Sequence, residues 1–336
     1  MLFLIWVIKR RIILILNNRM SKTLLLIGGS GFFGKSILKY FDCHRNSLKK
    51  KFSKIIIFSR GKIKTKFNKN SKKFFKFIKI NSNIQHAKTL PSADYVIYAA
   101  ILGDYKKDHA AVKNYLSLAK KYHSKSKVLY ISSGAIYGKQ PNSITGFREN
   151  YLESYKKINF KEGYKKQYSN TKIKNEQLFK KFGKTGKNVS IARCFSFVGE
   201  YLPQDSYYVV GNIIKNILNN HEIKVNADYK VIRSYMYDDD LVRWLLKILD
   251  NSRKDCPIFN VGSDDVISVH KLAVLLAQKY DLNINFKNKK ISKKIIDKYS
   301  PNIYKAKKEL ELKNNYTSLD AIVKTITLLK KNEKVN

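Results

Sequence analysis

The chain has 336 residues and a formal charge of +42, from 67 Lys and Arg against 25 Asp and Glu. Hydrophobic residues make up 44% of it and include 22 Tyr and 18 Phe, which excludes a chain that is disordered for lack of core-forming residues. The length suffices for about two domains and a buried parallel sheet. Most of the cationic residues are Lys, and we interpret the charge as compositional drift with lysines on solvated faces, because a surface selected for nucleic acid would concentrate its charge on one element.

Residues 1–21 are expected to lie outside the fold, as a disordered extension or a mis-assigned start. Two apolar runs, Leu2 to Ile8 and Ile12 to Leu16, are split by three cationic residues, so neither approaches the roughly 20 residues that span a bilayer. These charges also follow the first apolar run, whereas a secretory signal carries them before it. A peripheral membrane contact is the alternative.

A nucleotide-binding turn is predicted just after this segment. From Thr23 the sequence has an apolar run, a glycine cluster and then apolar residues at helical spacing, which predicts strand, turn and helix. Gly28, Gly31 and Gly34 stand three apart in that cluster. A tight turn needs a residue without a Cβ atom, a pyrophosphate must approach bare backbone, and the helix N-terminus offers unpaired N–H groups to the anion. The segment therefore predicts dinucleotide binding rather than a purely structural turn.

The end of the second predicted strand indicates which cofactor binds. After the strand at 54–58, Ser59 and Arg60 occupy the place where NAD-selective folds usually carry an acid for the ribose hydroxyls. A small residue followed by Arg suits a 2′-phosphate, so we expect NADP(H) to be favoured over NAD(H). The alternative is that Arg60 points to solvent. The Lys- and Asn-rich stretch 61–73 is expected to be a solvated insertion.

Further strands complete a doubly wound sheet. They are expected at residues 77–80, 95–100 and 127–132, with an amphipathic helix at 108–122. Asn83 is expected to face the adenine, and Ala99 and Ala100 would let the backbone lie close to the cofactor. Strands that alternate with helices predict an α/β fold with a parallel, Rossmann-type sheet.

A candidate catalytic group follows the fifth strand. Tyr168 and Lys172 stand four residues apart in a segment that is expected to open a helix, so the phenol and the ammonium share one face. A neighbouring cation stabilises phenolate and lowers a tyrosine pKa toward the range of a general base. This spacing alone says little in a chain with 22 Tyr. It gains weight because the strand at 127–132 delivers Ser132 and Ser133 to a carboxyl end of the sheet, where such folds bind ligands.

Together these motifs resemble the extended short-chain dehydrogenase/reductases of the NAD-dependent epimerase/dehydratase family, which act on nucleotide sugars. The matching segments run in order from about Thr23 to about Leu329 and comprise the glycine turn, YVIYAA, ISSGAIYG, YSNTK, RCFSFVG, RSYMYDDD, FNVG, and a tail with KKELEL and TSLDAI. Within the family, RCFSFVGEYLP followed by GNII is most similar to bacterial enzymes of surface-polysaccharide sugar biosynthesis.

The resemblance implies roles for individual residues. Ser133 would bind the substrate, Tyr168 would be the base, and Lys172 would hold the nicotinamide ribose and tune the tyrosine. The implied cofactor contacts are Gly28, Ser30, Gly31, Phe32, Phe33, Gly34, Ser59, Arg60, Asn83, Ala99, Ala100 and Lys172. The implied substrate contacts are Ser133, Phe195, Ser196, Asn212 and Arg233, of which the last would grip the diphosphate.

Two departures from the family pattern bear on the reaction. Ser196 replaces a frequent Asn, and Gly134 and Ala135 stand where sugar 4,6-dehydratases carry an Asp-Glu pair. The resemblance thus implies an NAD(P)-dependent nucleotide-sugar epimerase or 4-ketoreductase that transfers hydride at a sugar carbon, C4, in polysaccharide or O-antigen sugar biosynthesis. The sequence does not separate these two reactions. A 4,6-dehydratase and a non-catalytic NAD(P)-binding or RNA-binding scaffold are the alternatives.

The same pattern divides the chain into two parts. We expect residues 22–194 to form an NAD(P)-binding Rossmann domain, and residues 195–228 and 263–330 to build a smaller C-terminal substrate-binding lobe. Residues 229–262 are expected to return to the first domain.

Expected partners follow from the cysteines and from the resemblance. Cys43, Cys194 and Cys256 form neither a metal knuckle nor a disulfide framework, so we expect a cytoplasmic protein without a metal. The resemblance implies a nucleoside-diphosphate sugar as substrate and a homodimer as the assembly. Nucleic acid is not an expected partner.

Overall fold

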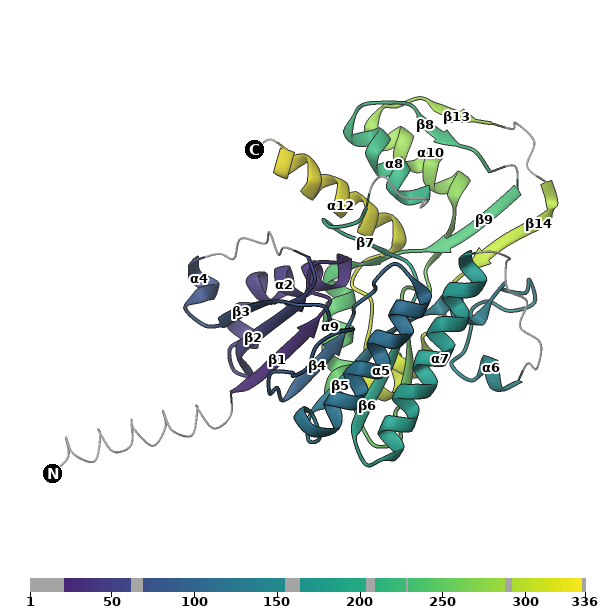
Figure 1. The fold of residues 1–336 in the computed structure, drawn as a ribbon. Coiled ribbons are helices and arrows are strands. Elements are labelled where there is room, and N and C mark those ends of the chain that lie inside the picture. Colours follow the sequence, from purple (N-terminus) through teal and green to yellow (C-terminus); the bar gives the residue numbers. More distant parts are fainter. Residues whose placement is uncertain are drawn as a thin grey trace.

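A seven-stranded parallel sheet forms the centre of the molecule (Figure 1). The computed structural model describes residues 21–61, 69–154, 164–203, 209–227, 229–287 and 292–333. In spatial order the strands are β11 (Ile258–Val261), β6 (Asn188–Cys194), β5 (Lys127–Ser133), β4 (Tyr95–Tyr98), β1 (Lys22–Ile27), β2 (Phe52–Ser59) and β3 (Lys76–Asn81). The order reverses beside β1, which pairs with β2 on one side and β4 on the other. Sheets of this kind bind ligands outside the carboxyl ends of the strands at such a reversal.

Helices cover both faces of this sheet, as Figure 1 shows. The covering helices are α2 (Phe32–Cys43) and α9 (Asp238–Asp250) on one face, and α5 (Tyr105–Tyr122) and α7 (Tyr164–Lys184) on the other. Because side chains alternate along a strand, Leu24 and Leu26 of β1 join the cluster with α2 and α9. Leu25 and Ile27 join the cluster with α5 and α7. The predicted doubly wound α/β fold is confirmed.

The predicted elements differ from the observed ones at their ends. Helix α7 begins at Tyr164, so Tyr168 lies inside the helix and does not open it. Strand β4 ends at Tyr98, and the Ala99–Ala100 backbone that follows lies against Gly28. The prediction of a solvated insertion at residues 61–73 is wrong in part. Lys69–Lys72 form a short helix, α4, and its Ser71 is buried. Residues 62–68 and the expected extension, apart from Ser21, lie outside the described residues.

A smaller lobe packs over the carboxyl end of the sheet (Figure 1). Its helices are α8 (Val209–Leu218), α10 (Val269–Tyr280) and α12 (Ser318–Glu333). Its strands form three small sheets: β12 (Val266–Ser268), β9 (Tyr229–Ser234) and β14 (Ser292–Tyr299); β13 (Ile284–Phe286) and β8 (Ile223–Val225); and β10 (Met236–Tyr237) and β7 (Phe197–Val198). The short elements α3 (Arg45–Leu48), the 3-10 turn η1 (Gly134–Tyr137), α6 (Tyr151–Ser154) and α11 (Tyr304–Leu310) complete the described chain.

The chain crosses between these two parts more than once. Within residues 229–262, α9 and β11 pack with the central sheet, whereas β9 pairs with β12 and β14 in the smaller lobe. Tyr299, the last residue of β14, lies opposite Arg233 of β9. This pairing carries the end of β14 back toward the carboxyl edge of the central sheet.

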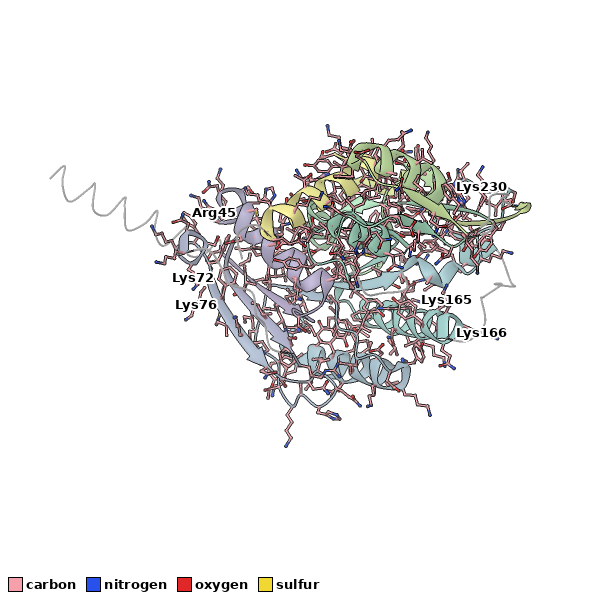
Figure 2. The ribbon with its side chains drawn as sticks, turned by 90° about the horizontal axis from the view of Figure 1, so that it is seen from above. Arg45, Lys72, Lys76, Lys165, Lys166 and Lys230 are labelled. Carbon is pink, nitrogen blue, oxygen red and sulfur yellow. The ribbon has the colours of Figure 1, made fainter. Side chains whose placement is uncertain are left out.

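Cationic side chains are distributed over both parts. Figure 2 shows labelled cations on α3, α4, β3, α7 and β9, with Lys72 and Lys165 at opposite ends of the molecule. A surface selected for a polyanion would concentrate such residues on one element.

A buried carboxylate lies where α2 packs against α9. Asp238, the first residue of α9, is 1% exposed. The Lys39 ammonium lies 3.5 Å from Asp238 Oδ2 and 3.4 Å from Glu200 Oε2. Burial raises the pKa of Asp238 from 3.8 to about 6, although Lys39 opposes this shift.

We expect Asp238 to make the folded state less stable as the pH rises. Its pKa is higher in the folded state than in the unfolded state, so the loss of stability begins above about pH 4 and is complete above about pH 6. An Asp238→Asn variant should therefore melt above the unmodified protein by more at pH 7.5 than at pH 4. Asp255→Asn is the control, because Asp255 is exposed and its hydrogen bond from Arg253 lowers its pKa. A difference in melting temperature that does not change with pH would contradict the assignment.

Candidate functional site

The glycine turn predicted from the sequence brings bare backbone against the residues that follow β4, the neighbouring strand in the sheet. Gly28 has a φ of 98°, and a Cβ atom on it would lie 2.6 Å from the Ala100 backbone nitrogen. A Cβ atom on Gly34 would lie 2.4 Å from Gly29 Cα. Both positions therefore require glycine, because α2 starts directly beside β1 and β4.

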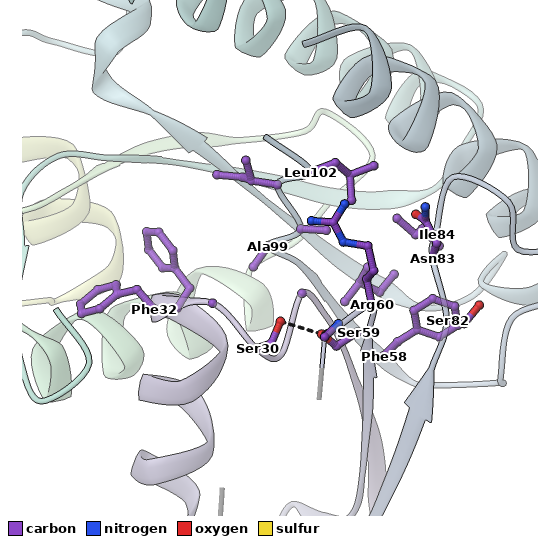
Figure 3. A pocket seen from close by; sticks show the side chains of 17 residues that line it. Ser30, Phe32, Phe58, Ser59, Arg60, Ser82, Asn83, Ile84, Ala99 and Leu102 are labelled. Atoms are coloured by element: carbon purple, nitrogen blue, oxygen red, sulfur yellow. Dashed lines mark hydrogen bonds between the residues drawn. The ribbon is translucent and has the colours of Figure 1, made fainter. Parts of the chain in front are cut away.

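A cavity of about 340 Å³ opens at this turn, between the ends of β1, β2 and β4. Figure 3 shows its wall, which consists of Ile27, Gly28, Ser30, Gly31, Phe32, Phe33, Phe58, Ser59, Arg60, Gly61, Ser82, Asn83, Ile84, Ala99, Ala100, Ile101 and Leu102. Every expected cofactor contact belongs to this wall except Gly34 and Lys172. A cradle that any Cβ atom would fill, at the N-terminus of α2, fits the pyrophosphate of a dinucleotide.

The polar side chains in the wall surround the end of β2. The Ser59 hydroxyl donates a hydrogen bond of 2.7 Å to the Ser30 hydroxyl, and Arg60 extends across the cavity toward Leu102 (Figure 3). None of the described residues that line the cavity is acidic. Asp108 lies close to this wall, and burial raises its pKa, while the Leu102 N–H, Lys172 and Arg60 oppose the shift.

Tyr168 and Lys172 lie together on α7, as their spacing predicts. The Lys172 ammonium is 5.8 Å from the centre of the Tyr168 ring and 5.1 Å from that of the Tyr130 ring. It donates a hydrogen bond of 3.0 Å to the Ile131 carbonyl, and Lys172 is only 6% exposed. The cation is therefore held between two aromatic rings and the end of β5.

The two adjacent serines at the end of β5 face different surroundings. Ser132 is buried and donates a hydrogen bond of 2.6 Å to Glu176. Ser133 accepts a hydrogen bond of 3.2 Å from the Ala135 N–H, and the Tyr299 phenol lies close to its hydroxyl. Ser132 is therefore committed to a contact inside the protein, whereas Ser133 is partly exposed at the end of the strand.

Tyr299 was not identified from the sequence as a site residue, although it lies close to Ser133 and Tyr168. Burial raises its pKa strongly, and the nearby Tyr168 raises it further. Its ring centre is 4.9 Å from that of Phe195. Nothing in the local sequence distinguishes it from the other tyrosines, because only the pairing of β14 with β9 brings it here.

Phe195 closes the space above Gly134. A Cβ atom on Gly134 would lie 2.6 Å from the Phe195 ring, so this position does not accept a larger residue unless the ring moves. Phe195 was an expected substrate contact, and it lies beside the catalytic group through Tyr299. The packing of the Phe195 ring therefore leaves no room for an acidic side chain at residue 134.

The other expected substrate contacts are dispersed. Arg233 donates to the Asp297 carboxylate at 3.0 Å and to two backbone carbonyls, so it joins β9 to β14. Asn212 lies on the exposed side of α8, and the Ser196 carbonyl accepts a hydrogen bond of 3.1 Å from the Met236 N–H. Their contacts with substrate stay predictions.

The described part of the chain contains neither a candidate metal cluster nor a membrane-spanning helix. No three His, Cys, Asp or Glu side chains gather there as a metal would need. None of its helices combines the length and the apolar character needed to pass through a bilayer.

Comparison with known proteins agrees with the fold and the motifs. The model of the NAD dependent epimerase/dehydratase family matches residues 24–262. Solved structures with the same fold include dTDP-glucose 4,6-dehydratase from Bacillus anthracis (TM-score 0.72, 18% identity, 94% of this chain and 98% of that one). They also include UDP-glucose 4-epimerase from Thermotoga maritima (TM-score 0.70, 18% identity, 93% of this chain and 99% of that one).

A curated relative matches over a shorter stretch. UDP-glucuronic acid decarboxylase 1 from Arabidopsis thaliana is 30% identical over 125 residues, which cover 37% of this chain and 28% of that protein. The match to the family model is longer and includes both the glycine turn and the Tyr168–Lys172 pair. This chain belongs to the NAD-dependent epimerase/dehydratase family, as its sequence motifs predict.

Proposed function

We propose that this protein is an NADP(H)-dependent nucleotide-sugar epimerase or 4-ketoreductase that acts at C4 of the sugar, in polysaccharide or O-antigen sugar synthesis. The observation that carries the proposal is the grouping of Tyr168, Lys172 and Ser133 beside a residue 134 that bears no side chain. The group supplies proton transfer at one oxygen. It contains no second acid–base pair of the kind that elimination of water requires.

Each residue of the group has one task in this reaction. Tyr168 takes the proton from the sugar hydroxyl, and the Lys172 ammonium favours its phenolate form. Ser133 donates a hydrogen bond to the same sugar oxygen while that oxygen becomes a carbonyl. A dinucleotide, which the cavity wall around Gly28 and Ser59 would hold, would supply hydride transfer to or from the sugar carbon. In the reverse direction, Tyr168 returns the proton as the ketone is reduced.

Known relatives support this class of reaction. The solved structures that share the fold include UDP-glucose 4-epimerase from Thermotoga maritima and UDP-N-acetylglucosamine 4-epimerase from Bacillus cereus. Dehydratases and decarboxylases are also among the relatives, so the distinction depends on the side chains beside Ser133.

One experiment decides between the two proposed reactions. The protein is incubated with a panel of nucleotide sugars and their 4-keto derivatives, and products are followed by NMR and reduced cofactor by absorbance. An epimerase gives the C4 epimer without net change in reduced cofactor, whereas a reductase consumes one reduced cofactor for each ketone. Absence of turnover across the panel would overturn the proposed function.

Tyr168→Phe should abolish turnover and leave cofactor affinity nearly unchanged. The substitution removes the base but no contact of the cavity wall, and loss of a positioned base typically lowers kcat by about 100-fold to 10,000-fold. Steady-state kinetics and a fluorescence titration with NADPH measure the two quantities. Tyr304→Phe is the control, because Tyr304 is 64% exposed. A kcat close to that of the unmodified enzyme would disprove the role of Tyr168.

Arg60→Ala should reduce the preference for NADP(H) over NAD(H). A charge-assisted contact with phosphate contributes roughly 1.5 to 3 kcal/mol, so NADP(H) affinity should fall by about one to two decades while NAD(H) affinity changes little. Calorimetric titrations of both cofactors provide the check. In the control, Arg45→Ala, the lost hydrogen bond is to the nearby Asp42 carbonyl, and Arg45 is not part of the cavity wall. Tighter binding of NAD(H) than NADP(H) by the unmodified protein would reject the cofactor assignment.

We expect no elimination of water from a nucleotide sugar. After C4 oxidation, that reaction needs one group to remove the C5 proton and another to protonate the departing C6 hydroxyl. Gly134 and Ala135 supply neither. The nearby carboxylate of Glu149 accepts a hydrogen bond of 2.9 Å from the Asn260 N–H instead, and Asp205 lies outside the described residues.

The check is an incubation with dTDP-glucose, CDP-glucose and GDP-mannose, followed by NMR for a C6 methyl signal. Catalytic formation of a 4-keto-6-deoxy sugar would move the protein to the dehydratases. Gly134→Asp should not gain this activity, because the Cβ atom that the substitution adds would overlap the Phe195 ring.

A further inference from the structure

A second polar cluster lies inside the protein, directly behind the catalytic group. Its centre is an ion pair between Arg193 of β6 and Glu176 of α7, which are 2% and 4% exposed. Arg193 Nη2 is 2.8 Å from Glu176 Oε2, and Arg193 Nε is 3.1 Å from Glu176 Oε1. The planar guanidinium therefore meets both oxygens of one carboxylate.

Hydrogen bonds extend from this pair to three other elements and to the turn at Glu149. Ser132 of β5 donates to Glu176 Oε1 at 2.6 Å. Arg193 Nη1 donates to the Tyr137 hydroxyl of η1 at 2.8 Å and to the Glu149 carbonyl at 2.7 Å. The Tyr137 hydroxyl donates in turn to Asn260 of β11 at 2.8 Å. The pair thus links α7 to the ends of three strands of the central sheet.

The positions of these residues connect the cluster to the catalytic group. Glu176 follows Lys172 by one helical turn and Tyr168 by two, so all three lie along one side of α7. Ser132 directly precedes Ser133 on β5. The hydrogen bond from Ser132 to Glu176 therefore joins the helix that carries the base to the strand that carries the substrate-binding hydroxyl.

A buried ion pair of this kind is weak evidence for stability alone. Replacing such a pair by apolar residues of similar volume is often neutral or stabilising, because the cost of removing two charges from water offsets their attraction. The pair instead fixes the orientation of α7 relative to β6, since the planar guanidinium of Arg193 meets the Glu176 carboxylate in one geometry. Proton transfer depends on such geometry, and a misplacement of about 1 Å can lower the rate about 100-fold.

We propose that Glu176 and Arg193 are positioning residues of the reaction, which hold α7 against β5 so that the Tyr168 phenol and the Ser133 hydroxyl meet the same substrate oxygen. This inference rests on the proposed function. It concerns residues that touch neither the cofactor cavity nor the sugar.

The test removes both charges at once. In Glu176→Met/Arg193→Met no charge is left unpaired, so the variant should melt close to the unmodified protein and bind NADPH with the same Kd. Its kcat should fall about 10-fold to 100-fold. The control is Arg253→Met/Asp255→Met, which removes an exposed pair and should leave kcat unchanged. An unchanged kcat in the folded Glu176/Arg193 variant would overturn the inference, because a merely structural pair predicts that result.

A milder variant keeps the test decisive if the double variant does not fold. Ser132→Ala deletes one hydrogen bond to Glu176 and retains the ion pair. It should lower kcat about fivefold, as expected for a hydrogen bond of about 1 kcal/mol, with no change in the Kd for NADPH. Equal kcat values for Ser132→Ala and the unmodified enzyme would contradict the inference.

Crystal structures separate this inference from the proposed function. In the double variant the separation of the Tyr168 and Ser133 oxygens should change by about 1 Å, and in Ser132→Ala by a smaller, measurable amount, whether or not a substrate is known. If the unmodified protein turns over no nucleotide sugar, the proposed function fails while this measurement still decides the inference. An unchanged separation would overturn the positioning role.

Discussion

Helices cover both faces of the central sheet up to its partly exposed edge strand β3, and the rest of the molecule depends on this constraint. Helices α2 and α9 cover one face and α5 and α7 the other, so β1 and β4 in the middle of the sheet are apolar along most of their length. Polar side chains that act on a ligand are therefore confined to the carboxyl edge, where the strands end. The reversal of strand order beside β1 opens this edge at one place, and the glycine turn lies there.

Buried charge is allowed at this edge only where the fold supplies partners. Lys172 is held by the Ile131 carbonyl and two aromatic rings, and Arg193 by a carboxylate, a phenol and a carbonyl. Both cations belong to the same interface between α7 and the central sheet. The orientation of α7 is thus determined by polar contacts as well as by the apolar core, and these contacts continue up to Tyr168.

The smaller lobe completes the site from the other side. Strand β14 brings Tyr299 against Ser133, and Phe195 packs between Tyr299 and Gly134. The Phe195 ring fills the space in which a side chain at residue 134 would have to lie, and Tyr299 packs against that ring. The chemistry open to the site is consequently restricted by packing from a distant part of the chain, and not only by the residues of its own motif.

Local patterns in the sequence determined the central sheet, the glycine turn and the pairing of Tyr168 with Lys172, because each depends on residues close together in the chain. The wall of the cavity followed from the same patterns, since parallel strands end at one edge. Tyr299, the contact of Phe195 with Gly134 and the Glu176–Arg193 pair were decided only by the tertiary structure. Their partners are distant in sequence or on different elements, and no local periodicity records which buried side chains will meet.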